Sequence, residues 1–183
     1  MREGHYCRLH SGRASWPKDP RPSDIHIADI AHALSHLCRF NGHCRKFYSV
    51  AEHSVLCSYI VPREYALEAL LHDAVEAYCG DMVMPLKRCM PEFLEVERKI
   101  DKAVRERFGL PKTMSEPVLL ADRRMVHLEF LELMNHTPED LLPMEPLAGI
   151  DDDVVIMCAG PDAMRPAFYR RFLELGGIEY ATC

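Results

Sequence analysis

The stretch REYALEALLHDAVEAYCGD, residues 63–81, decides the fold class of this 183-residue chain. Small and apolar residues recur in it at helical spacing, namely Ala66, Ala69, Leu70, Ala74 and Ala77. This spacing predicts one closely packed, buried helix from Arg63 to Cys79, and Gly80 stands where a C-terminal cap belongs. Runs of alternating β-branched residues, which would predict strands, are nearly absent elsewhere. We therefore expect an all-α fold.

Helical patterns continue on both sides of this stretch. They predict further helices over residues 24–38, 49–61, 91–108, 115–135 and 163–175. The Pro- and Asp-rich residues 137–153 indicate an extended loop, and residues 154–160 fit either a short strand or a helical turn.

The chain is long enough for one substantial core and too short for two comfortable domains. Residues 1–23 are polar and rich in Pro and Arg, so they predict an irregular N-terminal arm. Residues 24–183 are then expected to form a single helical-bundle domain.

A capping box opens the predicted helix at residue 49. In this motif the Ser49 hydroxyl and the Glu52 carboxylate satisfy backbone N–H groups that the first helical turn leaves free. The motif places His53 early in its helix.

Charge and composition restrict the possible partners. A net charge of −6 argues against a protein that coats a nucleic-acid polymer, because such binding depends on clustered Lys and Arg.

No apolar stretch approaches the roughly 20 residues that span a bilayer, and the polar start has no apolar core typical of a signal peptide. Eight cysteines without a CxxC pair are expected to be free thiols in a reducing compartment, the cytoplasm.

His72 and Asp73 carry the sharpest chemical signal. They are adjacent, Glu76 follows one helical turn later, and Asp81 comes just after the glycine cap. A His-Asp pair alone is weak, but this one lies in an apolar helix, where a buried imidazole and carboxylate must be paired or bound to a metal. Asp122 lies in a similarly apolar segment.

The chain resembles the HD-domain phosphohydrolases over residues 24 to 135. Their signature is a His on one helix, an adjacent His-Asp on a second and an Asp on a later helix. Within that superfamily it is most similar to small bacterial 5'-deoxynucleotidases and phage dATP triphosphohydrolases. The shared pattern consists of Arg39-Phe40, EHS at 52–54, LLHDAVEAYCGD at 70–81, PLK at 85–87 and AD at 121–122.

The resemblance implies an HD-type helical bundle and a role for each matching residue. The implied metal ligands are His53, His72, Asp73 and Asp122. Glu76 and Asp81 would orient the attacking water and move protons, and Arg39 and Lys87 would hold phosphate. The nucleoside pocket would include Phe40, where relatives often have Trp, and His43. Homo-oligomer formation is also implied.

A divalent metal is the expected cofactor. Mixed His and carboxylate ligands favour Mn, Co, Fe, Ni or Zn over Mg alone. The expected substrate is a deoxynucleotide, cleaved either as a dNTP to release triphosphate or as a dNMP to release phosphate. Another phosphate ester, such as a cyclic or signalling nucleotide, and a non-catalytic nucleotide-binding module remain open as alternatives.

Overall fold

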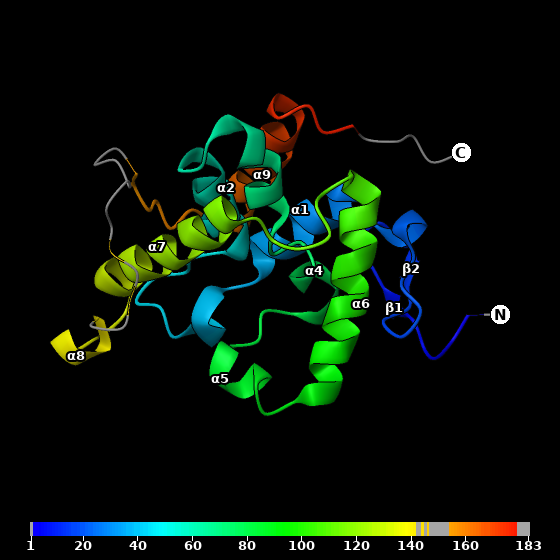
Figure 1. The fold of residues 1–183 in the computed structure, drawn as a ribbon, viewed down its shortest axis with the longest axis horizontal. Coiled ribbons are helices and arrows are strands. Elements are labelled where there is room, and N and C mark those ends of the chain that lie inside the picture. The colour runs from blue at the N-terminus through cyan, green and yellow to red at the C-terminus, as the bar shows by residue number, and fades with distance from the viewer. Residues whose placement is uncertain (1, 142–143, 145, 147–153, 179–183) are drawn as a thin grey trace.

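A computed structural model describes residues 2–141, 144, 146 and 154–178. In these ranges the protein is mostly helical, with a small hairpin near its N-terminus, so the all-α expectation is confirmed (Figure 1). The longer helices are α1 (Ile27–His36), α2 (Val50–Tyr59), α6 (Pro91–Phe108), α7 (Glu116–Leu133) and α9 (Pro161–Glu174). The shorter ones are α3 (Ala66–Leu71), α4 (Glu76–Cys79), α5 (Met84–Lys87) and α8 (Pro138–Leu141). The 3-10 turns are η1 (Pro22–Asp24), η2 (Arg39–Gly42) and η3 (Arg63–Tyr65).

The main core lies where α1, α2, α3 and α9 meet. Helix α1 buries Ile30 and Leu34 on one face, and α9 contributes the fully buried rings of Phe168 and Phe172. Ala51 of α2 is small enough to let neighbouring helices approach closely. Helix α6 closes this core from another side with Ile100, Ala103 and Val104.

Helix α7 packs separately, against α2 and α3. Its Val118 and Met125 form a smaller cluster with Cys57 of α2 and Ala69 of α3. This contact brings the middle of α7 beside the ends of α2 and α3, and these three elements enclose the candidate site.

The predicted helix from Arg63 to Cys79 is interrupted at residues 72–75. The chain tightens there, because the Ala74 N–H donates to the Leu71 carbonyl three residues back (3.0 Å). The Ala69 carbonyl accepts from His72 Nδ1 (2.8 Å). A single continuous helix was therefore wrong, and the break falls at the His-Asp pair. Gly80 ends α4 with a φ of 85°, as its capping position predicts.

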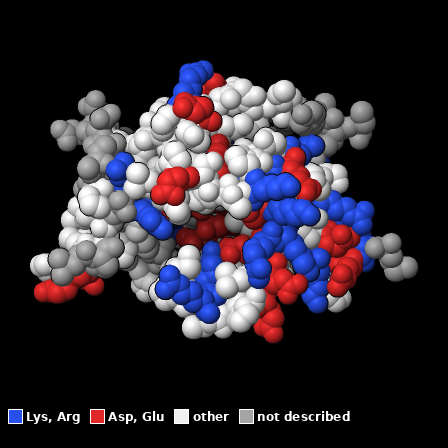
Figure 2. All heavy atoms as spheres, viewed as in Figure 1, with Lys and Arg blue, Asp and Glu red and all other residues white. Residues whose placement is uncertain are grey.

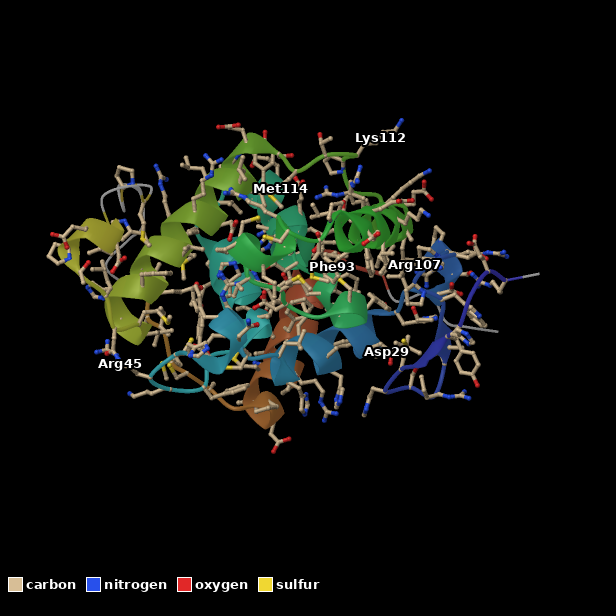
Figure 3. The ribbon with its side chains drawn as sticks, turned by 90° about the horizontal axis from the view of Figure 1, so that it is seen from below. Asp29, Arg45, Phe93, Arg107, Lys112 and Met114 are labelled. Atoms are coloured by element: carbon tan, nitrogen blue, oxygen red, sulfur yellow. The ribbon has the colours of Figure 1, made fainter. Side chains whose placement is uncertain are left out.

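The N-terminal arm is more ordered than its composition predicted. β1 (Cys7–Arg8) and β2 (Ala14–Ser15) pair antiparallel. The arm is fixed to α1 by Ser11, whose backbone N–H and hydroxyl donate to the two oxygens of the Asp29 carboxylate (2.7 and 2.8 Å). Figure 3 labels Asp29 on α1, beside the arm.

Residues 154–160 form neither a strand nor a helical turn, contrary to both expectations. The backbone N–H groups of residues 157–159 all donate to the buried Glu52 carboxylate, at 2.6, 2.9 and 2.9 Å. The capping box is therefore half right: the Ser49 hydroxyl accepts from the Glu52 N–H (3.1 Å), but the Glu52 side chain caps a distant segment instead.

The predicted loop over residues 137–153 begins with α8, and most of the rest lies outside the described residues. Within the described ranges, no helix is both long enough and apolar enough to cross a bilayer.

Candidate metal centre

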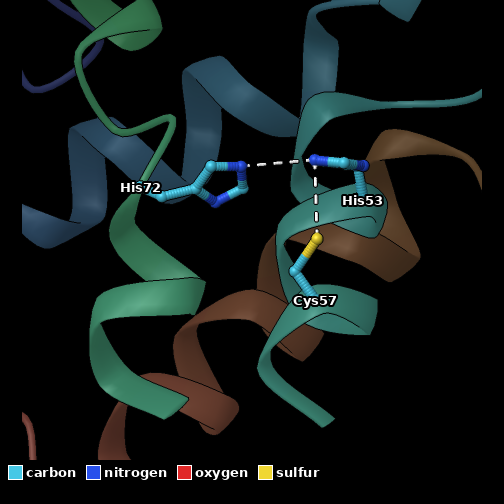
Figure 4. A group of neighbouring side chains, drawn as sticks. All are labelled: His53, Cys57 and His72. Carbon is cyan, nitrogen blue, oxygen red and sulfur yellow. Dashed lines mark hydrogen bonds between the residues drawn. The ribbon is translucent and has the colours of Figure 1, made fainter. Parts of the chain in front are cut away.

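The structure brings the four predicted ligand side chains together. His53 comes from α2, His72 and Asp73 from the turn after α3, and Asp122 from α7. The two Nε2 atoms of the histidines are 3.3 Å apart (Figure 4). His53 Nε2 lies 3.2 Å from Asp122 Oδ1, and His72 Nε2 lies 3.2 Å from Asp73 Oδ2. The longer diagonals, His53 to Asp73 and His72 to Asp122, are 3.7 and 3.8 Å.

These separations suit one divalent ion. Ligand atoms about 2.0 to 2.2 Å from a metal stand about 2.8 to 3.6 Å apart in octahedral or tetrahedral geometry. Three of the measured distances fall in that range, and the two diagonals exceed it by a tenth or two of an ångström. Shifts of that size are small, so the four donors could close on an ion with little movement.

Both imidazoles are oriented by a hydrogen bond at the other ring nitrogen. His53 Nδ1 donates to Glu129 Oε1 (2.5 Å), and His72 Nδ1 donates to the Ala69 carbonyl (2.8 Å). These acceptors carry no proton, so each Nε2 presents a lone pair to the centre. Two lone pairs facing each other at 3.3 Å repel unless a cation or a proton lies between them.

In the metal-free protein, a proton on a histidine Nε2 atom would remove this repulsion. Burial disfavours charged imidazoles, but the surrounding carboxylates outweigh it and raise the pKa of His53 and His72 well above the ordinary value. Burial likewise opposes ionisation of Asp73 and Asp122, yet the two imidazoles hold the pKa of each carboxyl below its usual range. The cluster therefore stabilises positive charge at its centre.

Glu129 is a site residue that sequence reasoning missed. It lies fully buried on α7, where Arg39 donates to its Oε2 through Nε and a terminal nitrogen, both at 3.1 Å. Burial raises the pKa of Glu129, but Arg39 and then His53 more than offset this, so the net shift is downward. Its position seven residues after Asp122 places both on one helix face, and that spacing was the available signal.

Arg39 lies behind the cluster. Its guanidinium is buried against Glu129 and reaches Asp73 Oδ2 at 3.5 Å. It therefore contacts both the carboxylate that orients His53 and one of the four predicted ligands. Phe40, with a left-handed φ of 53°, packs edge-on against Phe130 of α7 (5.4 Å between ring centres). His43, three residues after Phe40, is exposed. The roles predicted for these three residues toward substrate stay predictions.

Glu76 and Lys87 line the cavity beside the centre, and the charge of Asp81 interacts with those of both Glu76 and Asp73. Burial, followed by the Asp73 and Asp81 charges, raises the pKa of Glu76 well above its usual value. Its Oε2 is buried and has no hydrogen-bond partner among the described residues. Burial also raises the pKa of Asp81. Lys87 Nζ donates to Glu97 Oε1 (2.6 Å).

A cavity of about 1000 Å³ opens from the cluster toward α6. His72, Asp73, Glu76 and Asp122 line its inner end. Its outer walls carry charges of both signs: the acidic residues Glu97, Asp101 and Glu106, and the cations Lys87, Arg98, Lys102, Arg105 and Lys112. Figure 2 shows the hollow, with acidic residues inside and both basic and acidic residues around its rim. An anion attracted by these cations would meet the four converging side chains at the inner end.

Cys57 offers an alternative donor. It lies fully buried one turn after His53 on α2, with its Sγ 3.5 Å from His53 Nε2 (Figure 4). His53, Cys57 and His72 form a buried group that could hold a metal ion. Sequence reasoning treated Cys57 as a free packing thiol, and the structure distinguishes it from the other described cysteines by its burial and its position beside His53.

Comparison with known proteins gives relatives without an assigned activity. No family model matches the chain. It is similar to the uncharacterized protein YfdR of Escherichia coli K12, with 49% identity over 128 residues that cover 70% of this chain and 72% of the relative. It is also similar to the uncharacterized protein RCAP_rcc00048 of Rhodobacter capsulatus, with 40% identity over 121 residues that cover 61% of this chain and 62% of the relative. The chain belongs to the same protein family as YfdR.

Proposed function

We propose that this protein is a metal-dependent phosphohydrolase of the HD type that acts on a deoxynucleotide. The observation that carries the proposal is the convergence of His53, His72, Asp73 and Asp122 on one point at the inner end of a cavity whose outer walls carry five cations and three acidic residues. The pattern of two imidazoles and two carboxylates is the one that the HD resemblance implies. The proposed ligand set is these four residues, with Cys57 a close fifth group.

A divalent ion held there would supply Lewis acidity toward a phosphoryl oxygen and lower the pKa of a nearby water. His53 and His72 would donate through Nε2, since their Nδ1 atoms are engaged elsewhere. The ligand donors suit a transition metal such as Mn, Co, Fe, Ni or Zn, with Mg less favoured.

Glu76 is suited to proton transfer. Its raised pKa keeps it protonated closer to neutral pH than an ordinary carboxyl group, which is the state needed to donate a proton to a leaving oxygen. Once ionised, Glu76 could accept a proton from water, and Asp81 would help to orient that water. The free Oε2 of Glu76 is available for such a contact.

The outer walls favour a phosphate-bearing substrate, because their five cations outnumber their three acidic residues. Lys87 lines the cavity, and its Nζ would act as a point charge toward phosphate after giving up its contact with Glu97. Arg39 would act mainly through Asp73 and Glu129, which it already contacts. The cavity has room for a nucleoside and its phosphates, and both dNTP and dNMP substrates fit this proposal.

Product analysis tests the proposal. The purified chain is incubated with Mn or Co and with all four dNMPs, all four dNTPs and their ribonucleotide counterparts. Triphosphate from a dNTP identifies a triphosphohydrolase, and phosphate from dNMPs identifies a 5'-deoxynucleotidase. No product from any of them would refute deoxynucleotide hydrolysis and direct the search to cyclic or signalling nucleotides, or to binding without turnover.

Variants separate the roles of the residues. Asp73→Ala should lose both bound metal and activity, whereas Glu76→Gln should keep the metal and lose turnover. Asp140→Ala, an exposed site on α8, is the matched control and should change neither. A fully active Asp73→Ala protein would remove this ligand assignment.

A further inference from the structure

A second cavity, of about 530 Å³, lies where α1, α9 and the N-terminal arm meet. Its volume is in the range of about 300 to 1000 Å³ that is typical of small-molecule sites. It shares no lining residue with the first cavity. The lining residues are His10 of the arm, Ala28 and Ala31 of α1, and Arg165, Pro166, Tyr169, Arg170 and Leu173 of α9.

Small side chains explain why space remains between two helices that otherwise pack against each other. Ala28 and Ala31 of α1 face this region, and their methyl groups leave room that a larger side chain would fill. Together with Pro166 and Leu173 they give the cavity an apolar floor. Such a floor favours a ligand with an apolar body.

The arm supplies a wall that is held in place. The His10 ring stacks on His32 of α1, with ring centres 3.5 Å apart and planes inclined by 11°. The next residue, Ser11, is fixed by its two hydrogen bonds to the buried Asp29. His10 therefore presents a fixed flat ring, and Tyr169 adds a second aromatic ring from α9.

The charges around this cavity are of one sign. Arg165 and Arg170 line it, and no carboxylate of the described residues does. By contrast, six Asp and Glu residues line the first cavity, and the whole chain carries a net charge of −6. Two guanidinium groups without a lining carboxylate favour an anion, because each can donate two parallel hydrogen bonds to phosphate or carboxylate oxygens.

From these features we infer that the second cavity binds a small organic anion that combines a flat, apolar ring system with one phosphate or carboxylate group. The ring would lie against His10 and Tyr169, and the anionic group would bind Arg165 and Arg170. A nucleoside monophosphate has this chemistry. The site requires no metal, so it stands independently of the hydrolase proposal.

Calorimetric titration of the full chain with AMP, in the presence of EDTA, tests the inference. EDTA removes the contribution of a metal-dependent site. AMP should bind at one site, and adenosine or inorganic phosphate alone should bind more weakly, because each lacks one of the two recognised parts. The Arg165→Ala/Arg170→Ala double variant should bind AMP at least about tenfold more weakly.

A matched control carries the same change in charge. Arg63 and Arg88 are exposed and line neither cavity, so the Arg63→Ala/Arg88→Ala variant should bind AMP like the wild type. His10→Ala should also weaken binding without altering an arginine. Thermal melts verify that each variant is folded.

Three results would overturn the inference: no AMP binding in EDTA at millimolar concentration, unchanged binding by the Arg165→Ala/Arg170→Ala variant, or binding of inorganic phosphate as tight as that of AMP. Loss of nucleotide hydrolysis in the Asp73→Ala protein with AMP binding intact would separate this site from the metal centre.

Discussion

Replacing Glu129 by alanine should damage both the stability and the metal affinity of the protein. The Glu129 carboxylate connects two buried groups, His53 through Nδ1 at 2.5 Å and Arg39 through two contacts at 3.1 Å. Without it, Asp73 is the one carboxylate among the described residues that still contacts the Arg39 guanidinium, and the His53 ring loses the partner that sets its tautomer.

The size of both effects can be worked out. Removing one member of a buried ion pair costs about 3 to 5 kcal/mol, because the remaining charge is left uncompensated. For a chain of this length each kcal/mol lowers Tm by about 2 to 4 °C, so the expected decrease is roughly 6 to 20 °C. Loss of a partner that orients a metal-binding histidine weakens metal binding by about 10- to 100-fold.

Differential scanning calorimetry and a competitive metal titration measure the two effects on the same samples. Glu129→Gln keeps an oxygen that can accept from His53 Nδ1, so its metal affinity should lie between those of wild type and Glu129→Ala. Glu132→Ala, an exposed change on the same helix, should behave like wild type. Unchanged metal affinity in a Glu129→Ala protein with a lowered Tm would refute the orienting role and leave only a packing role.

Three further outcomes are expected. Glu52→Ala should lower the free energy of unfolding by about 2 to 4 kcal/mol in urea titrations, because the N–H groups of residues 157–159 lose their acceptor; a change near zero would contradict this. Gly177→Ala should cost about 1 to 3 kcal/mol, since a Cβ there would lie 2.4 Å from the buried Phe172 ring; an unaltered Tm would disprove the close contact. The two histidines of the candidate metal centre have raised pKa values in the folded metal-free protein, so their contribution to its stability is full below about pH 6.5 and is lost as the pH rises through the folded pKa. Metal binding needs neutral imidazoles and should strengthen over the same rise, and melts with and without EDTA across pH should therefore diverge.

Helix positions were largely predictable because they depend on local periodicity. The expected helix over residues 91–108 matches α6, and Gly109 ends it in a left-handed conformation. The His-Asp pair was recognisable because it directly follows an apolar run, where a polar pair needs an explanation. The four side chains named as ligands do converge, although metal binding itself stays a prediction.

Contacts between distant parts of the chain were not predictable. The local sequence shows Glu129 as one more acidic residue on a predicted long helix. The packing of α7 on α2 is what brings it to His53. At the break, residues 72–75, the His72 side chain contacts the Ala69 carbonyl, and hydrophobic periodicity cannot predict such a contact. Glu52 satisfies the local capping pattern, so nothing in the pattern indicates that its carboxylate binds residues 157–159.

The first turn of α2 binds two distant segments of the chain, and this has a consequence for biosynthesis. Glu52 binds backbone groups 105 to 107 residues later in the chain, and the neighbouring His53 binds a carboxylate 76 residues later. A ribosome releases the chain from its N-terminus, so α2 emerges long before either partner exists. His72 finds its orienting acceptor, the Ala69 carbonyl, close by in the sequence, whereas a nascent chain that stops short of α7 would leave His53 without the carboxylate that orients its ring.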